Sequence, residues 1–306
     1  MKLSVIICTH NPRRDHLNRM LASLQAQTYH TDNWELVLID NASNPPLEEE
    51  LDLSWHPKAR IISEPTLGIL PARVRGIQEA QADLLLFVDD DNLLEPNYLE
   101  TALEIGETHP FLGCWGGQLI PEFEETPPDW IDRFKLLLAC VEIPRDRWSN
   151  FTHDYSVLPP TAGMCLRREI AEEFIRLVET DSRRQLLGRR GKKGLTNCED
   201  TDLALTACDL GFGNGQFVRL KLTHLIPASR LDRDYVLRFA ESSFMSSFVL
   251  RVIRGEKLDP HPSAGPGLRP KLGSIRRRLM WDRARRELYE CELRGYQRAC
   301  ELVADW

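Results

Sequence analysis

The sequence predicts an α/β protein with a mostly parallel β-sheet that helices cover on both faces, followed by a C-terminal helical extension. Two observations predict this fold class. Short, continuously apolar runs alternate with helical periodicity over the first half of the chain, as in parallel strands buried on both faces. A Pro- and Gly-rich stretch at 255–270 then leads to an expected terminal helix at about 274–304, and residues 267–306 contain ten basic and six acidic side chains. This extension is basic, although the whole chain carries a net charge of -7.

Four strands and two helices are expected in the first half. The strands are the apolar runs at 3–8, 35–40, 60–63 and 84–88. Between the first two, Leu17, Met20, Leu21 and Leu24 recur at helical spacing and define the buried face of one helix. The second helix covers about 69–80.

The second half is less regular. Further strands are expected at 112–120, 139–143, 161–166 and 217–226, and helices at 168–178, 198–210, 234–254 and 274–304. Thr196 or Asn197 would cap the helix at 198. A basic loop at 180–197 is either a solvated surface or a mobile lid over an anionic ligand. We divide the chain into a domain at 1–254, with halves 1–111 and 112–254, and an extension at 255–306.

Composition excludes some classes of protein. The 306 residues are 42% hydrophobic and 28% charged, which excludes wholesale disorder. Mild overall acidity argues against a general nucleic-acid binder. The eight cysteines show no C-x-x-C spacing, and no apolar run is long enough for a leader or a membrane span. We therefore expect a cytoplasmic protein, with a peripheral contact to the inner face of the membrane left open.

Three acidic residues, Asp89, Asp90 and Asp91, follow the strand at 84–88. Adjacent carboxylates raise one another's pKa unless a cation neutralises them. Because Mg²⁺ and Mn²⁺ are typically held by one or two carboxylates together with substrate phosphates, the run predicts a metal–diphosphate site. The alternative is a solvated acidic loop in which Asn92 caps a helix.

Polar residues also follow the first two strands: Thr9, His10 and Asn11 after one, Asp40 and Asn41 after the other. Ligands of an open α/β sheet bind beyond the carboxyl ends of the strands. We therefore expect these residues in one site, although each cluster alone fits ordinary turn chemistry.

Charged residues on the helices extend this site. Arg73 lies on an apolar helix stripe and needs an anion, either a bound diphosphate or an internal aspartate. Glu199 and Asp200 lie in the first turn of a helix, where they either serve the helix dipole or supply a general base. His224 is either structural or part of a metal site, and Arg230 follows it in a short loop.

An aromatic residue and two glycines, Trp115, Gly116 and Gly117, interrupt the strand at 112–120. Sugars stack on aromatic faces, so we expect these three residues to bind an acceptor. The alternative is a core tryptophan.

Five segments together resemble the family 2 glycosyltransferases of the GT-A fold. They are SVIICTHN (4–11), ELVLIDNAS (35–43), LGILPARVRG (67–76), LLLFVDDDN (84–92) and NCEDTDLALTACDLGFG (197–213). They run in the family's order over about residues 3–230. The resemblance implies an inverting transferase that uses a nucleotide-diphospho-sugar, with a UDP-sugar as donor, and a divalent Mn or Mg ion.

The resemblance also implies residue roles. Asp200 matches the family's catalytic base, with Glu199 as its companion, and Asp91 matches the metal ligand, with Asp89 and His224 beside it. The nucleotide-sugar site is expected to contain Thr9, His10, Asn11, Arg13, Asp40, Asn41, Ser43, Arg73, Asp89, Asp90 and Arg230.

The sequence departs from the commoner family pattern in two places. The second strand ends Asp-Asn-Ala-Ser at 40–43 rather than Asp-Asp-Gly-Ser, and 71–76 reads PARVRG rather than ARNxG. Both departures fall in the nucleotide site and leave Asp200 unaffected.

The expected function is hexosyl transfer to an acceptor hydroxyl in polysaccharide or glycan biosynthesis. The alternatives are a catalytically inactive sugar-nucleotide binding module and a metal-dependent phosphotransferase, which would need a downstream lysine in fixed order. The expected partners are a nucleotide-sugar and a saccharide or lipid-linked saccharide, and no nucleic acid. The C-terminal helix either contacts an anionic membrane or packs on its own domain or a second subunit.

Overall fold

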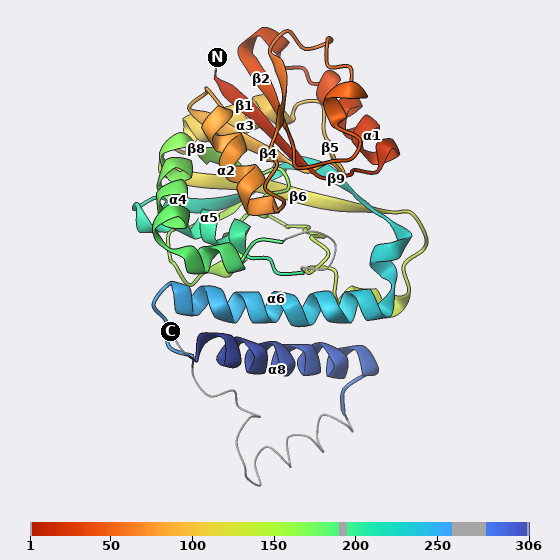
Figure 1. The fold of residues 1–306 in the computed structure, drawn as a ribbon, viewed down its shortest axis with the longest axis vertical. Helices are drawn as coiled ribbons and strands as arrows, with labels where there is room; N and C mark the ends of the chain where they lie inside the picture. Colours follow the sequence, from red (N-terminus) through yellow and green to blue (C-terminus); the bar gives the residue numbers. More distant parts are fainter. Residues whose placement is uncertain (1, 190–194, 259–279, 305) are drawn as a thin grey trace. The chain divides into compact units, whose positions relative to one another are not determined.

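The computed structural model describes residues 2–189, 195–258, 280–304 and 306 (Figure 1). The chain divides into two compact units. Unit 1 consists of Met1–Glu122, Ala139–Asp181 and Glu199–Ile226, and unit 2 of Phe123–Leu138, Ser182–Cys198 and Pro227–Trp306. The boundary expected near residue 254 falls inside unit 2, because helix α6 (Arg233–Ile253) groups with the C-terminal segment.

Unit 1 is built on one mixed, nine-stranded sheet of order β3-β2-β1-β4-β8-β6-β9-β5, in which β7 pairs with β9. The strands are β1 Leu3–Thr9, β2 Trp34–Asp40, β3 Ala59–Ser63, β4 Leu84–Val88, β5 Asn92–Leu94, β6 Leu112–Phe123, β7 Arg147–Ser149, β8 Cys165–Arg167 and β9 Gly213–Ile226. Strands β1 to β4 are parallel, so their carboxyl ends meet at one edge. Strand β8 is antiparallel to β4 and β6, and β5 is antiparallel to β9.

Helices cover both faces of this sheet, which confirms the expected fold class. They are α1 Arg14–Gln25, α2 Ile69–Glu79, α3 Tyr98–Thr108, α4 Arg168–Thr180 and α5 Glu199–Asp209. Alternate residues of a strand point to opposite faces. In β4, Leu86 packs in the core cluster that contains α1 and α3, whereas Phe87 packs in the cluster that contains α2, α4 and α5.

Several expected local structures differ from the observed ones. The segment at 139–143 is not a strand, because it meets β6 only through a single bridge between Leu119 and Val141. Asn197 is not the cap of α5: its side-chain amide donates a 2.6 Å hydrogen bond to Ser243 of α6. The short strands β5 and β7 and the helix α3 were not expected from the sequence.

Unit 2 contains a pair of long helices, α6 and α8 (Arg283–Val303), which lie side by side (Figure 1). Ion pairs join them: Glu241 of α6 accepts from Arg294 at 2.6 Å and from Arg298 at 3.0 Å. Gly295 permits their close approach, because a Cβ there would lie 2.8 Å from the backbone oxygen of Glu241. The extension is therefore helical, as expected.

Parts of the predicted extension and basic loop, 259–279 and 190–194, lie outside the described residues, including the start of the helix expected at 274–304. Within the described ranges, no helix combines the length and the apolar character that a bilayer crossing requires.

Candidate functional site

The polar ends of β1 and β4 meet directly. The hydroxyl group of Thr9, the last residue of β1, donates a short hydrogen bond to a carboxylate oxygen of Asp90, just after β4. The parallel pairing of these strands brings the two chain ends together. Thr9 is buried and Asp90 is half-buried. Asp90 therefore joins the two strand ends, and its neighbours Asp89 and Asp91 flank this junction.

Asp40, at the end of β2, organises the loop that follows it. One carboxylate oxygen accepts from the backbone N–H of Ser43 at 3.1 Å, and the other accepts from that of Leu47 at 2.8 Å. The Asp40 side chain is buried, so these bonds replace water on both oxygens. Asp40 was expected to contact the nucleotide. In this structure both oxygens of its carboxylate hold the loop.

Asn41 connects that loop to the segment before α2. Its amide nitrogen donates to the carbonyl oxygens of Glu64 at 3.0 Å and Thr66 at 2.8 Å, and its amide oxygen accepts from the N–H of Gly68 at 2.8 Å. Nδ1 of His10 donates to the carbonyl oxygen of Asn41 at 2.7 Å. Three of the expected nucleotide residues, His10, Asn41 and Asp40, thus fix loops at the strand edge.

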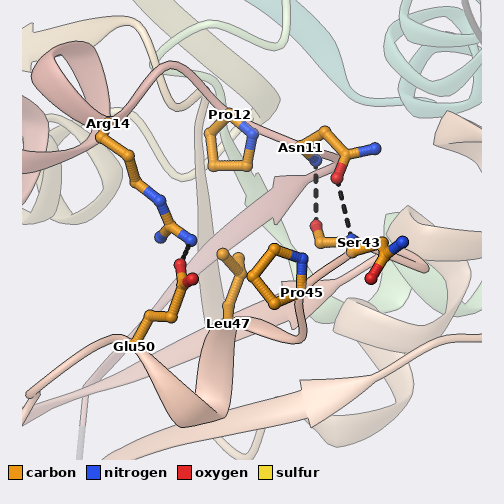
Figure 2. A pocket seen from close by; sticks show the side chains of 8 residues that line it. Asn11, Pro12, Arg14, Ser43, Pro45, Leu47 and Glu50 are labelled. Carbon is orange, nitrogen blue, oxygen red and sulfur yellow. Dashed lines mark hydrogen bonds and ion pairs between the residues drawn. The ribbon is translucent and has the colours of Figure 1, made fainter.

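The loops after β1 and β2 line an open pocket of about 230 Å³ (Figure 2). The pocket is lined by Asn11, Pro12, Arg14, Ser43, Asn44, Pro45, Leu47 and Glu50. As Figure 2 shows, Pro12 lies across the pocket from Pro45 and Leu47, and an ion pair between Arg14 and Glu50 closes one end.

Hydrogen bonds close the other end of the pocket. The backbone N–H of Asn11 donates to the hydroxyl of Ser43, and the Asn11 side-chain oxygen accepts from the N–H of Asn44, both at 2.9 Å (Figure 2). The result is a slot with apolar walls and polar ends. Arg13, which was expected in the nucleotide site, is half-exposed and pairs with Asp15 at 2.7 Å.

Asp91 and His224 come together from β4's end and β9. Pairing of β5 with β9 places His224 opposite Asn92, so that Nε2 of His224 lies 3.6 Å from Oδ2 of Asp91. Both side chains are buried. Within the described ranges no group of three or more His, Cys, Asp or Glu residues is arranged to hold a metal ion.

Arg73, Glu199 and Thr161 form a buried cluster. Nη1 of Arg73 donates a short hydrogen bond to Oε1 of Glu199, and Nη2 donates to the hydroxyl oxygen of Thr161 at 2.5 Å. All three side chains are less than a tenth exposed. Among the described residues, none gives a hydrogen bond to the buried Oε2 of Glu199. Arg73 therefore has an internal anion, the second of the two expected alternatives, although the anion is a glutamate.

Burial dominates the electrostatics of this cluster. It raises the pKa of Glu199 to about 7, against the opposing effect of the Arg73 charge. Burial alone would lower the pKa of Arg73, but the carboxylates of Glu199, Asp89 and Asp200 raise it. One guanidinium thus interacts with the acidic run after β4 and with both carboxylates at the start of α5.

Asp200 is half-buried beside the fully enclosed Glu199. One oxygen of its carboxylate accepts from the backbone N–H of Thr201 at 2.7 Å. The two adjacent carboxylates therefore have different surroundings, and Asp200 is the more accessible of the two.

Trp115 does not provide a stacking face for an acceptor, which corrects that expectation. Its ring is fully buried, and its N–H donates to the carbonyl oxygen of Ala102 at 3.1 Å. Gly117 is required for strand packing, because a Cβ there would lie 2.0 Å from the backbone oxygen of Leu220. A Cβ on Gly116 would meet Pro159 at 2.9 Å. We therefore do not retain this trio as an acceptor site.

Other residues of the site were not predicted from the sequence. Thr161 lies in a loop with no motif around it, and the pocket residues Pro12, Arg14, Leu47 and Glu50 have no recognisable spacing. Only the turn-forming Pro45 and Pro46 signalled a loop there. Arg230, one of the expected nucleotide residues, belongs to unit 2, in a short 3₁₀ helix at Ala228–Leu231.

The fold is the α/β architecture that the resemblance to family 2 glycosyltransferases predicted. The family model described as glycosyl transferase family 2 matches residues 4–174, more than half of the chain. The chain belongs to this family.

Two individual relatives match less than half of the chain, at about 30% identity. A glucosyl-dolichyl phosphate glucuronosyltransferase of Haloferax volcanii is 28% identical over 150 residues, 46% of either chain. An uncharacterized glycosyltransferase of Haemophilus influenzae is 32% identical over 108 residues, 35% of either chain. The chain thus spans less than half the length of these curated relatives.

A solved structure has the same fold. S. aureus TarS 1-349 has a TM-score of 0.51 and 14% identity, with 98% of this chain and 81% of that chain covered. The same protein in complex with UDP gives a TM-score of 0.50.

Proposed function

We propose that this protein is an inverting hexosyltransferase that moves a sugar from a UDP-sugar to an acceptor hydroxyl, with Asp200 as general base. One observation carries the proposal: the buried guanidinium of Arg73 donates a hydrogen bond to Glu199, the residue before Asp200, and lies within electrostatic range of Asp89 and Asp200. The acidic run that would face the diphosphate and the candidate base therefore belong to one cluster within unit 1. Family membership supports the reaction class.

The pocket of Figure 2 is our proposed place for the nucleobase. A planar ring fits between Pro12 on one side and Pro45 with Leu47 on the other, and Ser43 and Asn44 offer polar contacts at the rim. Asp40 is not among the residues that line this pocket, and its carboxylate holds the loop through the N–H groups of Ser43 and Leu47, so it supports the pocket indirectly. The UDP-bound TarS is consistent with uracil as the base.

The residues near the acidic run fit a divalent cation. Asp91 and His224 present a carboxylate and an imidazole 3.6 Å apart, and half-buried Asp89 precedes Asp91 by two residues in the chain. Mg²⁺ and Mn²⁺ need only one or two protein ligands when substrate phosphates and water complete the shell, so a larger protein cluster is not required. Such a cation, when bound, would supply charge stabilisation to the departing diphosphate.

In the proposed reaction, a carboxylate oxygen of Asp200 takes the proton of the acceptor hydroxyl. The acceptor oxygen forms its bond to the anomeric carbon as the bond from that carbon to the UDP oxygen breaks. UDP leaves with the electron pair of that bond, and attack from the opposite face inverts the anomeric centre. Arg73 is an unsuitable contact for UDP, because its side chain is buried and its guanidinium already pairs with Glu199 and Thr161.

We further propose a saccharide or lipid-linked saccharide as the acceptor, used in the cytoplasm in glycan synthesis. The relative from Haloferax volcanii supports a lipid-linked acceptor, because its name refers to a glucosyl-dolichyl phosphate. The family match disfavours the alternative of a phosphotransferase.

A donor panel tests the proposal and identifies the sugar. UDP-glucose, UDP-N-acetylglucosamine, UDP-galactose and UDP-glucuronate are each incubated with Mn²⁺, with and without saccharide acceptors, and UDP release is measured. Asp200→Asn should lower transfer at least 100-fold and leave the Kd for UDP within twofold. Asp209→Asn, an exposed carboxylate in the last turn of α5, is the control and should stay active. Wild-type turnover by Asp200→Asn would refute the base, and UDP binding without turnover of any donor would favour an inactive binding module.

A further inference from the structure

The Arg73 cluster joins three segments that are far apart in the sequence. Arg73 itself comes from α2, Glu199 opens α5, and Thr161 lies in the loop before β8. The hydrogen bonds from Arg73 span 126 residues to Glu199 and 88 residues to Thr161. The guanidinium also lies over the ring of Phe87 in β4, 5.9 Å from its centre. A single side chain therefore ties α5 and the 161 loop to α2 and to the strand that ends at the acidic run.

Because the three side chains are buried, a lost contact in this cluster is costly. Arg73 is 5% exposed, Glu199 7% and Thr161 3%, so water replaces little of any bond that is lost. An ion pair that is enclosed in this way strongly resists the removal of one partner, because the other charge is left without compensation. The hydroxyl of Thr161 is the neutral member, and its removal tests the cluster without leaving a buried charge unpaired.

The position of Glu199 in α5 couples the cluster to the proposed base. Glu199 and Asp200 are consecutive residues of the first helical turn. The Glu199 side chain is anchored inside the protein, and Asp200 remains half-buried at its side. Any shift of Glu199 relative to Arg73 moves the backbone that carries Asp200. A carboxylate that is enclosed and bound to a guanidinium is poorly placed to receive a proton from an acceptor.

We propose that Glu199 and Thr161 are positioning residues for the transfer reaction, which act through Arg73 to hold Asp200 at the distance and angle that proton removal requires. This inference rests on the proposed function, since it assumes that Asp200 is the base. It separates the two members of the Glu199-Asp200 pair by role: one is anchored and the other reacts. Small displacements of a catalytic group lower kcat more than they lower substrate binding.

The decisive experiment uses Thr161. Thr161→Val keeps the shape of the side chain and removes the oxygen that accepts from Arg73. With the UDP-sugar that gives the highest turnover in the panel, we expect kcat to fall 5- to 20-fold, with donor KM and the Kd for UDP within twofold of wild type. Thr161→Ser retains the hydroxyl and should recover kcat to within threefold.

A matched control lies on the same helix as the base. Thr206 of α5 is fully buried, and its hydroxyl donates to the carbonyl oxygen of Asp202 at 2.9 Å, away from Arg73. Thr206→Val loses a buried hydroxyl in the same way and should leave kcat within twofold. Equal losses of kcat in Thr161→Val and Thr206→Val would show a general stability effect and overturn the positioning role.

A second variant uses the charge. Glu199→Gln keeps an oxygen that can accept from Arg73 and removes the group that titrates. The charged groups that act on Glu199 are Arg73 of α2 and Asp200 of its own helical turn. Asp89 and Cys8 act on Arg73 in turn. Because burial raises the pKa of Glu199 to about 7, the wild-type pH profile of kcat should carry an inflection there that Glu199→Gln lacks.

The outcomes separate this inference from the proposed function. A folded Thr161→Val protein with wild-type kcat, or an unchanged inflection in Glu199→Gln, would overturn the positioning role while Asp200 remained the base. Full activity of Asp200→Asn would instead overturn the proposed base and the inference together.

Discussion

The side-chain nitrogen of Asn41 donates a hydrogen bond of 2.8 Å to the carbonyl oxygen of Thr66. A second bond from the same nitrogen reaches the carbonyl oxygen of Glu64 at 3.0 Å. A carboxylate cannot donate either bond. The structure thus gives a physical reason for asparagine at a position where the commoner family pattern has aspartate: the loop needs a donor here.

Asn41→Asp should therefore destabilise the protein. The change leaves two carbonyl groups without a donor and places a carboxylate next to them, at a cost of about 2–4 kcal/mol. Denaturant unfolding measures the effect. Asn33→Asp at an exposed site is the control and should change the free energy of unfolding by less than about 0.5 kcal/mol. Equal stability of Asn41→Asp and wild type would contradict the role of Asn41 as a donor.

Ala42→Gly should stabilise the protein. Ala42 has φ of 56°, in the left-handed region, where a side chain costs roughly 1–2 kcal/mol. Glycine removes that cost but gains freedom in the unfolded chain, so we expect a net increase of up to about 1 kcal/mol in the free energy of unfolding.

Ala22→Gly gives the opposite sign as a control for Ala42→Gly. Ala22 is exposed in the interior of α1, and glycine there should cost about 1 kcal/mol. A loss of stability in Ala42→Gly would show that the left-handed backbone is not strained.

His56 should make stability depend on pH. Its ring packs at 4.2 Å from the centre of Trp34, and burial lowers its pKa to about 4. The unfolded chain binds this proton near pH 6.5 and the folded protein only near pH 4, so folding stability should fall as the pH drops through this window.

His56→Phe should flatten this pH dependence by roughly 2–3 kcal/mol between pH 6.5 and 4. Urea unfolding at a series of pH values checks it. His30→Gln, at an exposed histidine, should leave the slope unchanged. Parallel curves for wild type and His56→Phe would mean that another group titrates.

Gly295→Ala should weaken the pairing of α6 and α8. The added Cβ would lie 2.8 Å from the backbone oxygen of Glu241 and the backbone nitrogen of Met245, which cannot move aside as a side chain can. We expect a net loss of about 1–2 kcal/mol, because overpacking outweighs the better helix propensity of alanine. Thermal unfolding measures the loss, and Gln297→Ala on the exposed side of α8 should be neutral. Unchanged stability would mean that the helices can separate at no cost.

Asp91→Asn should weaken cation binding. With UDP present, calorimetric titration of Mn²⁺ should give an apparent Kd at least 10-fold higher, because one negative ligand is lost. Asp52→Asn, at an exposed carboxylate, should bind Mn²⁺ as wild type does. Identical Kd values for Asp91→Asn and wild type would place the cation elsewhere.

Much of the fold could be predicted because continuous apolar runs such as Leu84–Val88 permit few alternatives. The end of each apolar run also predicts where its strand ends. The sequence therefore placed Thr9 and Asp90, which lie at the ends of two such strands, in one site. The segment at 139–143 was misassigned as a strand because an apolar run does not show whether a partner strand pairs with it. Trp115 was misassigned because the same ring suits a core and a sugar face.

Long-range pairs were the least accessible to sequence reasoning. The need of Arg73 for an anion followed from its place on an apolar stripe, but Glu199 was not recognised as that anion. The sequence placed Glu199 in the first turn of a helix, and nothing local showed that α2 would pack within reach of it. Thr161 has no signal at all, since its role exists only in contact with Arg73.

The cluster of Arg73, Glu199 and Thr161 has a consequence for sequence evolution. A change at one of the three positions leaves a buried group without its partner, so the intermediate sequence is penalised whichever position changes first. Descendants of this chain are therefore expected to keep all three residues or to replace them together. The three positions should vary as one unit across homologues, even where the loops around the pocket diverge freely.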